Sequence, residues 1–300
     1  MNWYWIKTYL RWGFKSLNLA LKNKRALRSD TLTIVSHVGL GDQILLSGLI
    51  NSFIAENKKV TWLVRKSNLE TVIKLTHSHP NLDFIILDDF DTSETARTKA
   101  IAHSKIKGIP TLFIGFELVW IAEKLFPARG LDEIFYKIAR VSFKVSQLNS
   151  LRLEKFLAPP LQEYALVDNF PNTNREIPRS VFQSIENRGL KIIDNPRDIP
   201  ILELMEVIRN AKEIHVVNSA LLCLIISMRN QVNNVSIYLM GPKILRGKFE
   251  YPLSWSEFSL TDSSGKPLVN PIHLDRNAEL LGLLTNERKF YRRLIAWVIF

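Results

Sequence analysis

The feature that constrains this chain most is residues 31–48, where an apolar strand leads through a glycine turn into a helix. Residues 31–35 form a short aliphatic and β-branched run, which is typical of a parallel strand buried on both faces. Gly39 and Gly41 are expected to allow a tight turn, and the helix is predicted over 43–54. The segment therefore predicts the first strand-to-helix step of an α/β fold.

Asp42 places a carboxylate at this turn. The first amide groups of a helix are unsatisfied and carry the positive end of the helix dipole, so the corner suits an anion or a carboxylate. In open α/β sheets, ligands bind at the carboxyl ends of the strands, where this turn is expected to lie. We therefore take Asp42 as a candidate residue of a ligand-binding site, with Gly39, Gly41 and Gln43 as the turn around it.

The rest of the chain repeats the alternation of strand and helix. Short apolar runs predict strands over 60–64, 84–87, 111–115, 164–167, 190–193, 213–217 and 236–240. Because helical patterns and short connections separate these runs, they predict two doubly wound parallel sheets. Pro159 and Pro160 lie at the expected boundary, and residues 262–276 predict a polar loop or crossing segment. The predicted organisation is an amphipathic helix over 1–29, α/β domains over 30–155 and 156–285, and a second amphipathic helix over 286–300.

A second corner of the same kind follows the strand predicted over 213–217. Asn218, Ser219 and Ala220 open an apolar helix, and its first amide groups are expected at the same edge of the sheet. Asn218 and Ser219 are each suited to cap this helix, and either also suits contact with a diphosphate. Both interpretations stay open on the sequence alone.

Three cations on predicted loops are candidates for holding a phosphorylated ligand. Arg175 follows the strand over 164–167, a position from which a guanidinium can clamp a phosphate with two hydrogen bonds. Lys243 and Arg246 follow the strand over 236–240. For each of the three, the alternative is a solvated surface side chain.

The net charge of +11 predicts an anionic partner. Residues 1–28 contain seven Lys and Arg residues and no acidic residue, with apolar residues at helical spacing between them. This basic amphipathic helix suits an anionic membrane surface or packing on its own domain, and residues 288–300 form a similar aromatic and basic segment. No nucleic-acid recognition motif is present, so no nucleic-acid partner is predicted. The single cysteine, Cys223, predicts a buried thiol in a reducing compartment and no structural zinc site.

With these motifs in hand, the chain resembles bacterial glycosyltransferases of the GT-B fold, in particular the heptosyltransferase-like family. Gly41-Asp42-Gln-Ile-Leu matches the strand, Gly-Asp turn and helix of that family, whose aspartate is the proposed catalytic base. The family's Asp-Thr-Gly-Leu-x-His-Leu motif aligns with residues 218–224, where Asn218 replaces the aspartate and Cys223 the histidine.

A group of little-characterised bacterial proteins, often found with surface-polysaccharide genes, is more similar still. It shares the Gly-Leu-Gly-Asp opening, a glycine at Gly48, and landmarks that correspond to Asp132–Tyr136, Asn174–Ile177 and Glu213–Ser219.

The resemblance implies two Rossmann-like domains that face a cleft, and an inverting glycosyltransferase that needs no metal ion and no cofactor. Asp42 is then expected to activate a hydroxyl of a surface glycan or glycolipid acceptor, bound by the first domain beside Gly39, Gly41 and Gln43. The second domain is expected to hold a nucleotide-sugar donor through Arg175, Asn218, Ser219, Ala220, Lys243 and Arg246.

Two other functions stay open. One is a non-catalytic protein of the same fold that binds a sugar nucleotide or serves as a scaffold. The other is an NAD-dependent oxidoreductase, which is disfavoured because Ile44 stands at the third glycine position of Gly-x-Gly-x-x-Gly. The expected location is the cytoplasm, with peripheral attachment to the inner leaflet of the membrane.

Overall fold

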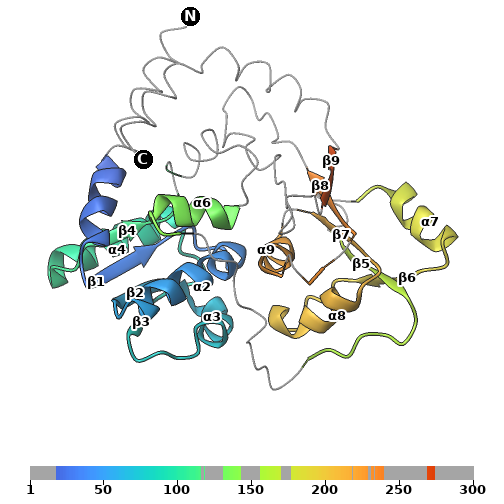
Figure 1. The fold of residues 1–300 in the computed structure, drawn as a ribbon, viewed down its shortest axis with the longest axis horizontal. Coiled ribbons are helices and arrows are strands. Elements are labelled where there is room, and N and C mark those ends of the chain that lie inside the picture. The colour runs from blue at the N-terminus through green and yellow to red at the C-terminus, as the bar shows by residue number, and fades with distance from the viewer. Residues whose placement is uncertain are drawn as a thin grey trace, which may run out of the picture. The chain divides into compact units, whose positions relative to one another are not determined.

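The computed structural model describes residues 18–115, 118, 131–142, 156–169, 177–217, 219–228, 231–232, 234–239 and 269–273. The chain divides into two compact units, whose described residues lie within 18–142 and 156–273. Each unit contains one parallel sheet with helices around it, so the prediction of two parallel-sheet α/β domains is confirmed (Figure 1). None of the described helices combines the length and the apolar character needed to cross a bilayer.

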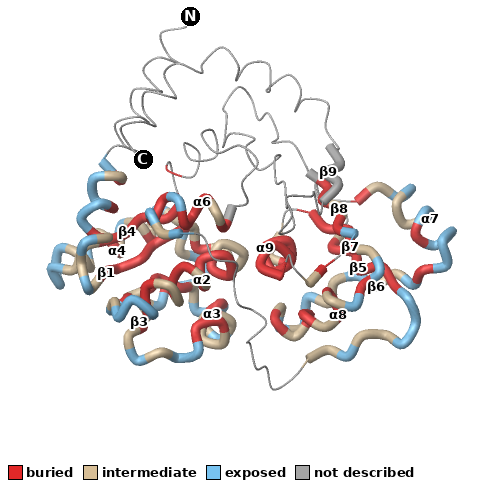
Figure 2. The backbone as a smooth tube through the Cα atoms, in the orientation of Figure 1, coloured by how far each residue is buried: buried red, intermediate tan, exposed pale blue. Residues whose placement is uncertain are grey.

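The first unit is built on a four-stranded sheet with the order β3-β2-β1-β4. Its elements after a helix over residues 18–27 are β1 (Thr31–Val35), α2 (Leu40–Ala55), β2 (Lys59–Arg65), the 3-10 turn η1 (Lys66–Asn68), α3 (Leu69–Thr76), β3 (Leu82–Leu87), α4 (Ser93–Lys107), β4 (Thr111–Phe113) and α6 (Leu131–Ile138). The central strand β1 is buried except at its first residue, and the neighbouring strand β2 is buried over most of its length (Figure 2). Trp62 on β2 is completely enclosed.

The winding of this sheet reverses once. The chain runs from β1 through β2 to β3 in one direction, and then crosses back to place β4 on the other side of β1. Right-handed crossovers then put α2 and α3 on one face and α4 on the other, where α4 contacts β1 and β4. The carboxyl ends of β1 and β4 therefore form the switch point at which open α/β sheets bind ligands.

The helix after β1 begins earlier than predicted. It starts at Leu40 rather than at Gln43, so Gly41 and Asp42 lie inside its first turn. Gly39 precedes the helix with φ −68° and ψ 147°, a backbone conformation that any residue can adopt. The prediction that glycine is needed here for a tight turn is therefore wrong. What favours glycine at this position is space, because a Cβ on Gly39 would lie 3.2 Å from Asp42 Oδ2.

The second unit is built on a five-stranded parallel sheet with the order β6-β5-β7-β8-β9. Its elements are β5 (Tyr164–Asp168), α7 (Arg179–Asn187), β6 (Lys191–Asp194), the 3-10 turn η3 (Ile201–Leu204), α8 (Met205–Asn210), β7 (Glu213–Val217), α9 (Ala220–Ser227), β8 (Val235–Leu239) and β9 (Val269–His273). The switch point of this sheet lies between β5 and β7.

β9 corrects a prediction, because residues 262–276 were expected to form a loop or crossing segment. Val269–His273 pairs in parallel with β8, with Pro271 opposite Ile237. Proline cannot donate to a strand ladder and is tolerated at the edge of a sheet, where β9 lies. The proline within residues 269–273 therefore explains why the sequence did not predict a strand there. Cys223, in contrast, is buried on α9 as predicted.

Candidate functional site

Asp42 lies in the first turn of α2, immediately beyond the carboxyl end of β1. Gln43 N donates to Gly39 O at 3.2 Å, which closes the first turn around the carboxylate. Asp42 is half-buried, so part of the residue stays accessible at this edge of the sheet. The structure therefore holds the sequence-predicted carboxylate where an α/β sheet binds its ligands.

Two effects act on the Asp42 carboxyl in opposite directions. Burial disfavours the charged form and raises its pKa, while the hydrogen bond from its own backbone amide lowers the pKa. Burial is the larger effect, and it raises the pKa of Asp42 from 3.8 to about 7. Near neutral pH the group is therefore part carboxylate and part acid, which suits a residue that accepts and releases a proton.

This pKa makes folding stability depend on pH. The folded chain holds the Asp42 proton more tightly than the unfolded chain, whose aspartate has a pKa near 3.8. The stabilisation is therefore fully present below that value and is lost as the pH rises through about 7. The loss amounts to at most about 4 kcal/mol, from about 1.36 kcal/mol for each pKa unit.

We expect Asp42→Asn to remove this pH dependence, because the amide cannot ionise. Denaturant unfolding at acid and at mildly alkaline pH should show the variant more stable than the wild type at the higher pH, with the difference vanishing towards about pH 4. A parallel pH dependence in the two proteins would contradict the raised pKa.

Gln43 is completely buried and connects α2 to the turn after β2. Its Oε1 accepts from Asn68 Nδ2 at 2.9 Å, while its Nε2 is enclosed without a hydrogen-bond partner among the described residues. The same Asn68 amide also approaches Val38 O at 3.4 Å. Gln43 therefore fixes the loops beside Asp42. The role of Gln43 in binding the acceptor stays a prediction.

His37 is a further residue of this edge that the sequence analysis did not single out. Its Nδ1 lies 3.4 Å from Ser93 Oγ, at the start of α4. Its ring packs against Gly115, where a Cβ would lie 2.9 Å from His37 Cδ2 and where φ is +110°. His37 and Gly115 follow the adjacent strands β1 and β4, so both lie at the switch point. The sequence feature that could have identified His37 as a site residue is its position between the predicted strand and Gly39.

The corresponding edge of the second unit is organised around Asp168, the last residue of β5. This carboxylate is 0% exposed and accepts from Ser219 Oγ at 2.5 Å and from Asn195 Nδ2 at 2.8 Å. The Arg197 guanidinium lies 3.7 Å from Asp168 Oδ1. The connections after β6 and β7 therefore meet on one buried carboxylate that ends β5, at the switch point.

Ser219 caps α9, which is one of the two interpretations of this position. Its Oγ accepts from Leu222 N at 3.3 Å while it donates its proton to Asp168. Ala220 is the first residue of the helix. The other predicted donor residues, Arg175, Asn218, Lys243 and Arg246, lie outside the described residues. The segment that contains Arg175 is flanked by Asn169 and Ile177, which are tied by a hydrogen bond of 2.8 Å from Ile177 N to Asn169 Oδ1.

No group of three His, Cys, Asp or Glu side chains within the described residues is arranged to hold a metal ion. The expectation that the reaction needs neither a metal nor a cofactor stays a prediction.

The comparisons with known proteins give similarity of structure and none of sequence. No protein-family model matches the chain, and no curated protein matches it. One similar solved structure is the bacterial iron-containing dodecameric glycosyltransferase TibC from enterotoxigenic E. coli H10407, at 13% identity and a TM-score of 0.43, covering 69% of this chain and 57% of TibC. Another is the glycosyl transferase family 9 protein from Veillonella parvula DSM 2008, at 10% identity and a TM-score of 0.45, covering 87% of this chain and 90% of that protein. The chain thus spans little more than half the length of TibC, and both similar structures are glycosyltransferases.

Proposed function

We propose that this chain is a glycosyltransferase that moves a sugar from a nucleotide-activated donor to a surface glycan or glycolipid, with inversion and without a metal ion. The observation that supports the proposal most is the Asp42 carboxyl, which lies at the switch point of the first sheet with a pKa of about 7. A carboxylate with an ordinary pKa is a weak base, and the raised value brings Asp42 close to the operating pH of a general base.

In the proposed reaction, Asp42 removes the proton from an acceptor hydroxyl as its oxygen attacks the anomeric carbon of the donor sugar. The bond from that carbon to the diphosphate oxygen breaks, and the electron pair leaves with the nucleotide diphosphate. The acceptor gains the sugar, and Asp42 keeps the proton until it passes to water. Because the attack comes from the side opposite the leaving group, the configuration at the anomeric carbon is inverted.

The leaving diphosphate gains negative charge as the bond breaks, so the second unit has to supply positive groups. We assign this role to the first amide groups of α9, which begins at Ala220, together with Arg175, Lys243 and Arg246. Asn218 and Ser219 complete the proposed donor corner. The contacts that Asp168 makes with Ser219, Asn195 and Arg197 offset its own charge, which would otherwise repel a diphosphate. In the proposed reaction, the sugar of the donor held by this corner is transferred to the acceptor hydroxyl that Asp42 activates.

The NAD-dependent alternative is supported less well by the first unit. Dinucleotide sites use an acidic residue at the end of the second strand to hold the ribose. Here β2 ends at Arg65, whose Nη2 donates to Asp91 O at 2.6 Å. Ile44, at the third glycine position, is buried in α2.

A screen of donors tests the proposed function. Calorimetric titration of the full chain with a panel of nucleotide sugars is expected to give binding that depends on the nucleotide, with NAD as the control ligand. A product assay with the bound donor is then expected to show slow hydrolysis in the absence of acceptor. Binding without any turnover would favour the non-catalytic alternative, and binding of NAD alone would overturn the proposal.

The proposed location is the cytoplasmic face of the inner membrane. It is supported by the basic amphipathic pattern of residues 1–28 and by an acceptor that includes glycolipids. The proposed partners are therefore the donor, the acceptor and an anionic membrane surface, without a nucleic acid.

A further inference from the structure

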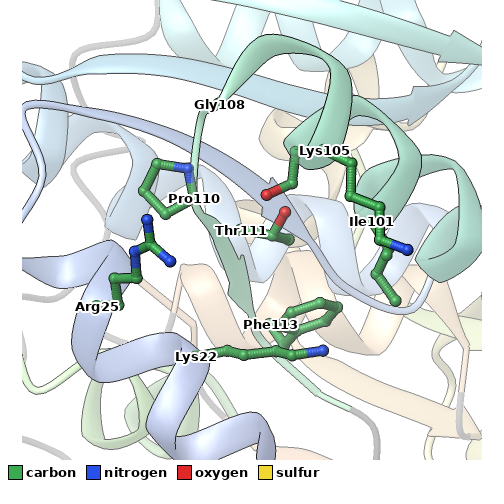
Figure 3. Close-up of a pocket in the computed structure, with 9 residues that line it drawn as sticks. Lys22, Arg25, Ile101, Lys105, Gly108, Pro110, Thr111 and Phe113 are labelled. Carbon is green, nitrogen blue, oxygen red and sulfur yellow. The ribbon is translucent and has the colours of Figure 1, made fainter.

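The first unit contains a basic pocket beside the edge strand β4. The cavity of about 320 Å³ lies between the helix over 18–27, the end of α4 and the start of β4 (Figure 3). Three cations line it, namely Lys22, Arg25 and Lys105. The hydroxyl residues Ser104 and Thr111 and the ring of Phe113 complete the part of the lining that matters here.

The pocket is separate from the candidate active site. Thr111 begins β4, whereas Asp42 follows the carboxyl end of β1, and these two strands run parallel side by side. Phe113, which ends β4, also lines the pocket, so the pocket lies along this edge strand. None of the described residues that line it belongs to β1, to α2 or to the connection between them.

Asn23 fixes the cations of the helix over 18–27 in place. This residue is 3% exposed, and its side-chain amide makes two hydrogen bonds with the backbone of Phe113. Asn23 Nδ2 donates to Phe113 O at 2.8 Å, and Phe113 N donates to Asn23 Oδ1 at 2.7 Å. Lys22 is additionally held 5.8 Å from the centroid of the Phe113 ring, a cation–π distance.

The charge in this pocket is not compensated by the described part of the chain. None of the ion pairs among the described residues involves Lys22, Arg25 or Lys105. The carboxyl end of α4, which stops at Gly108, contributes about half a negative charge, much less than three cations. An anion is therefore the ligand that this pocket favours.

Two exposed apolar side chains are neighbours of these cations in the sequence. Leu21, which precedes Lys22, is 62% exposed, and Ile106, which follows Lys105, is 79% exposed. Apolar side chains next to cations are the combination by which peripheral proteins bind anionic membrane surfaces. The cavity is many times larger than the about 10–15 Å³ that one water needs, so it can accept a phosphate group with part of its ester.

We propose that this pocket binds a phosphate group, and that its source is the headgroup of an anionic phospholipid. Arg25 supplies a guanidinium fork for the phosphate oxygens, and Lys22 and Lys105 supply point charges. The site seats the first unit on the membrane through the helix over 18–27, the end of α4 and the edge strand β4. This site does not depend on the transfer reaction.

The test compares two variants that remove equal charge from the same surface. The pocket variant is K22Q/R25Q/K105Q, and the control variant is K24Q/R28Q/K107Q. Each set takes one Lys and one Arg from residues 22–28 and one Lys from the last turn of α4, and all six side chains are exposed. Only the first set lines the cavity. Both full-length variants keep residues 1–17, so any contribution of that segment is common to them.

One arm measures sedimentation with phosphatidylcholine vesicles that contain phosphatidylglycerol, and the other measures calorimetric binding of glycerol 3-phosphate. We expect the pocket variant to bind the vesicles at least about 10-fold more weakly than the control variant, which diffuse attraction alone would not produce. Loss of glycerol 3-phosphate binding in the pocket variant, with equal vesicle binding of the two variants, supports the phosphate site with a soluble ligand. Equal behaviour of the two variants in both arms, or no binding in either arm, overturns the proposal.

Discussion

Asp42→Asn is expected to lower turnover by about 10²- to 10⁴-fold, the range that a general base contributes. The amide has nearly the shape of the carboxylate, so the first turn of α2 and its contact with Gly39 are retained. It has no basic oxygen of comparable strength, so the acceptor hydroxyl keeps its proton as it attacks. The loss should therefore appear in kcat while the affinity for the donor, measured by calorimetry, stays the same.

Asp88→Asn is the matched control for this experiment. Asp88 follows β3 at the same edge of the sheet and is exposed, so it offers the same chemical change outside the half-buried corner of Asp42. Its turnover is expected to stay within about 2-fold of the wild type, as for surface substitutions generally.

The wild-type rate is also expected to rise with pH through about 7 and then level off, which follows the pKa of Asp42. Full activity of Asp42→Asn would remove this residue from the mechanism.

Asp168→Ala is expected to destabilise the second unit by about 3 kcal/mol, the lower end of the cost of breaking a buried charge pair. The substitution leaves Ser219 Oγ and Asn195 Nδ2 without their acceptor and Arg197 without its carboxylate. The lower end applies because Arg197 is 47% exposed and water can solvate it.

Hydrogen exchange measures this loss of stability and also shows which elements of the second unit it affects. Amides of β5 and α9 should exchange on the order of 10²-fold faster in Asp168→Ala, because both elements meet at the lost carboxylate. Asp194→Ala is the control, since Asp194 ends the neighbouring strand β6 and is exposed. Equal exchange in the two variants would mean that the contacts of Asp168 contribute no more than those of a surface carboxylate.

The local features of the candidate site could be predicted from the sequence, because they depend on neighbours in the chain. A strand followed by glycines and an acidic residue places Asp42 at a sheet edge, and Ser219 before an apolar run is a helix cap. The contacts of Asp168 could not be predicted, because they join residues as far apart as 51 positions. The environment that raises the pKa of Asp42 is likewise a property of packing.

The landmark Glu213–Ser219 shows how one sequence signature combines two roles. His215 Nδ1 lies 2.8 Å from the Tyr238 hydroxyl, and its Nε2 lies 3.2 Å from Glu213 Oε2. Burial lowers the pKa of His215, so the ring is neutral near pH 7 and bridges β7 to β8 within the sheet. This half of the landmark supports the fold, whereas Ser219 belongs to the edge where ligands are expected.

The contact between Asn23 and Phe113 also bears on solubility. β4 is the last strand in the order of its sheet, and an uncovered last strand presents backbone groups to which a strand of another molecule can add. The Asn23 amide occupies both backbone groups of Phe113, in the way a neighbouring strand would. A chain shortened to begin after this helix would lack the Asn23 side chain that covers the backbone of Phe113. Such a chain would be prone to aggregate through the edge strand β4. We therefore expect the helix over 18–27 to hinder the addition of a strand from another molecule to β4.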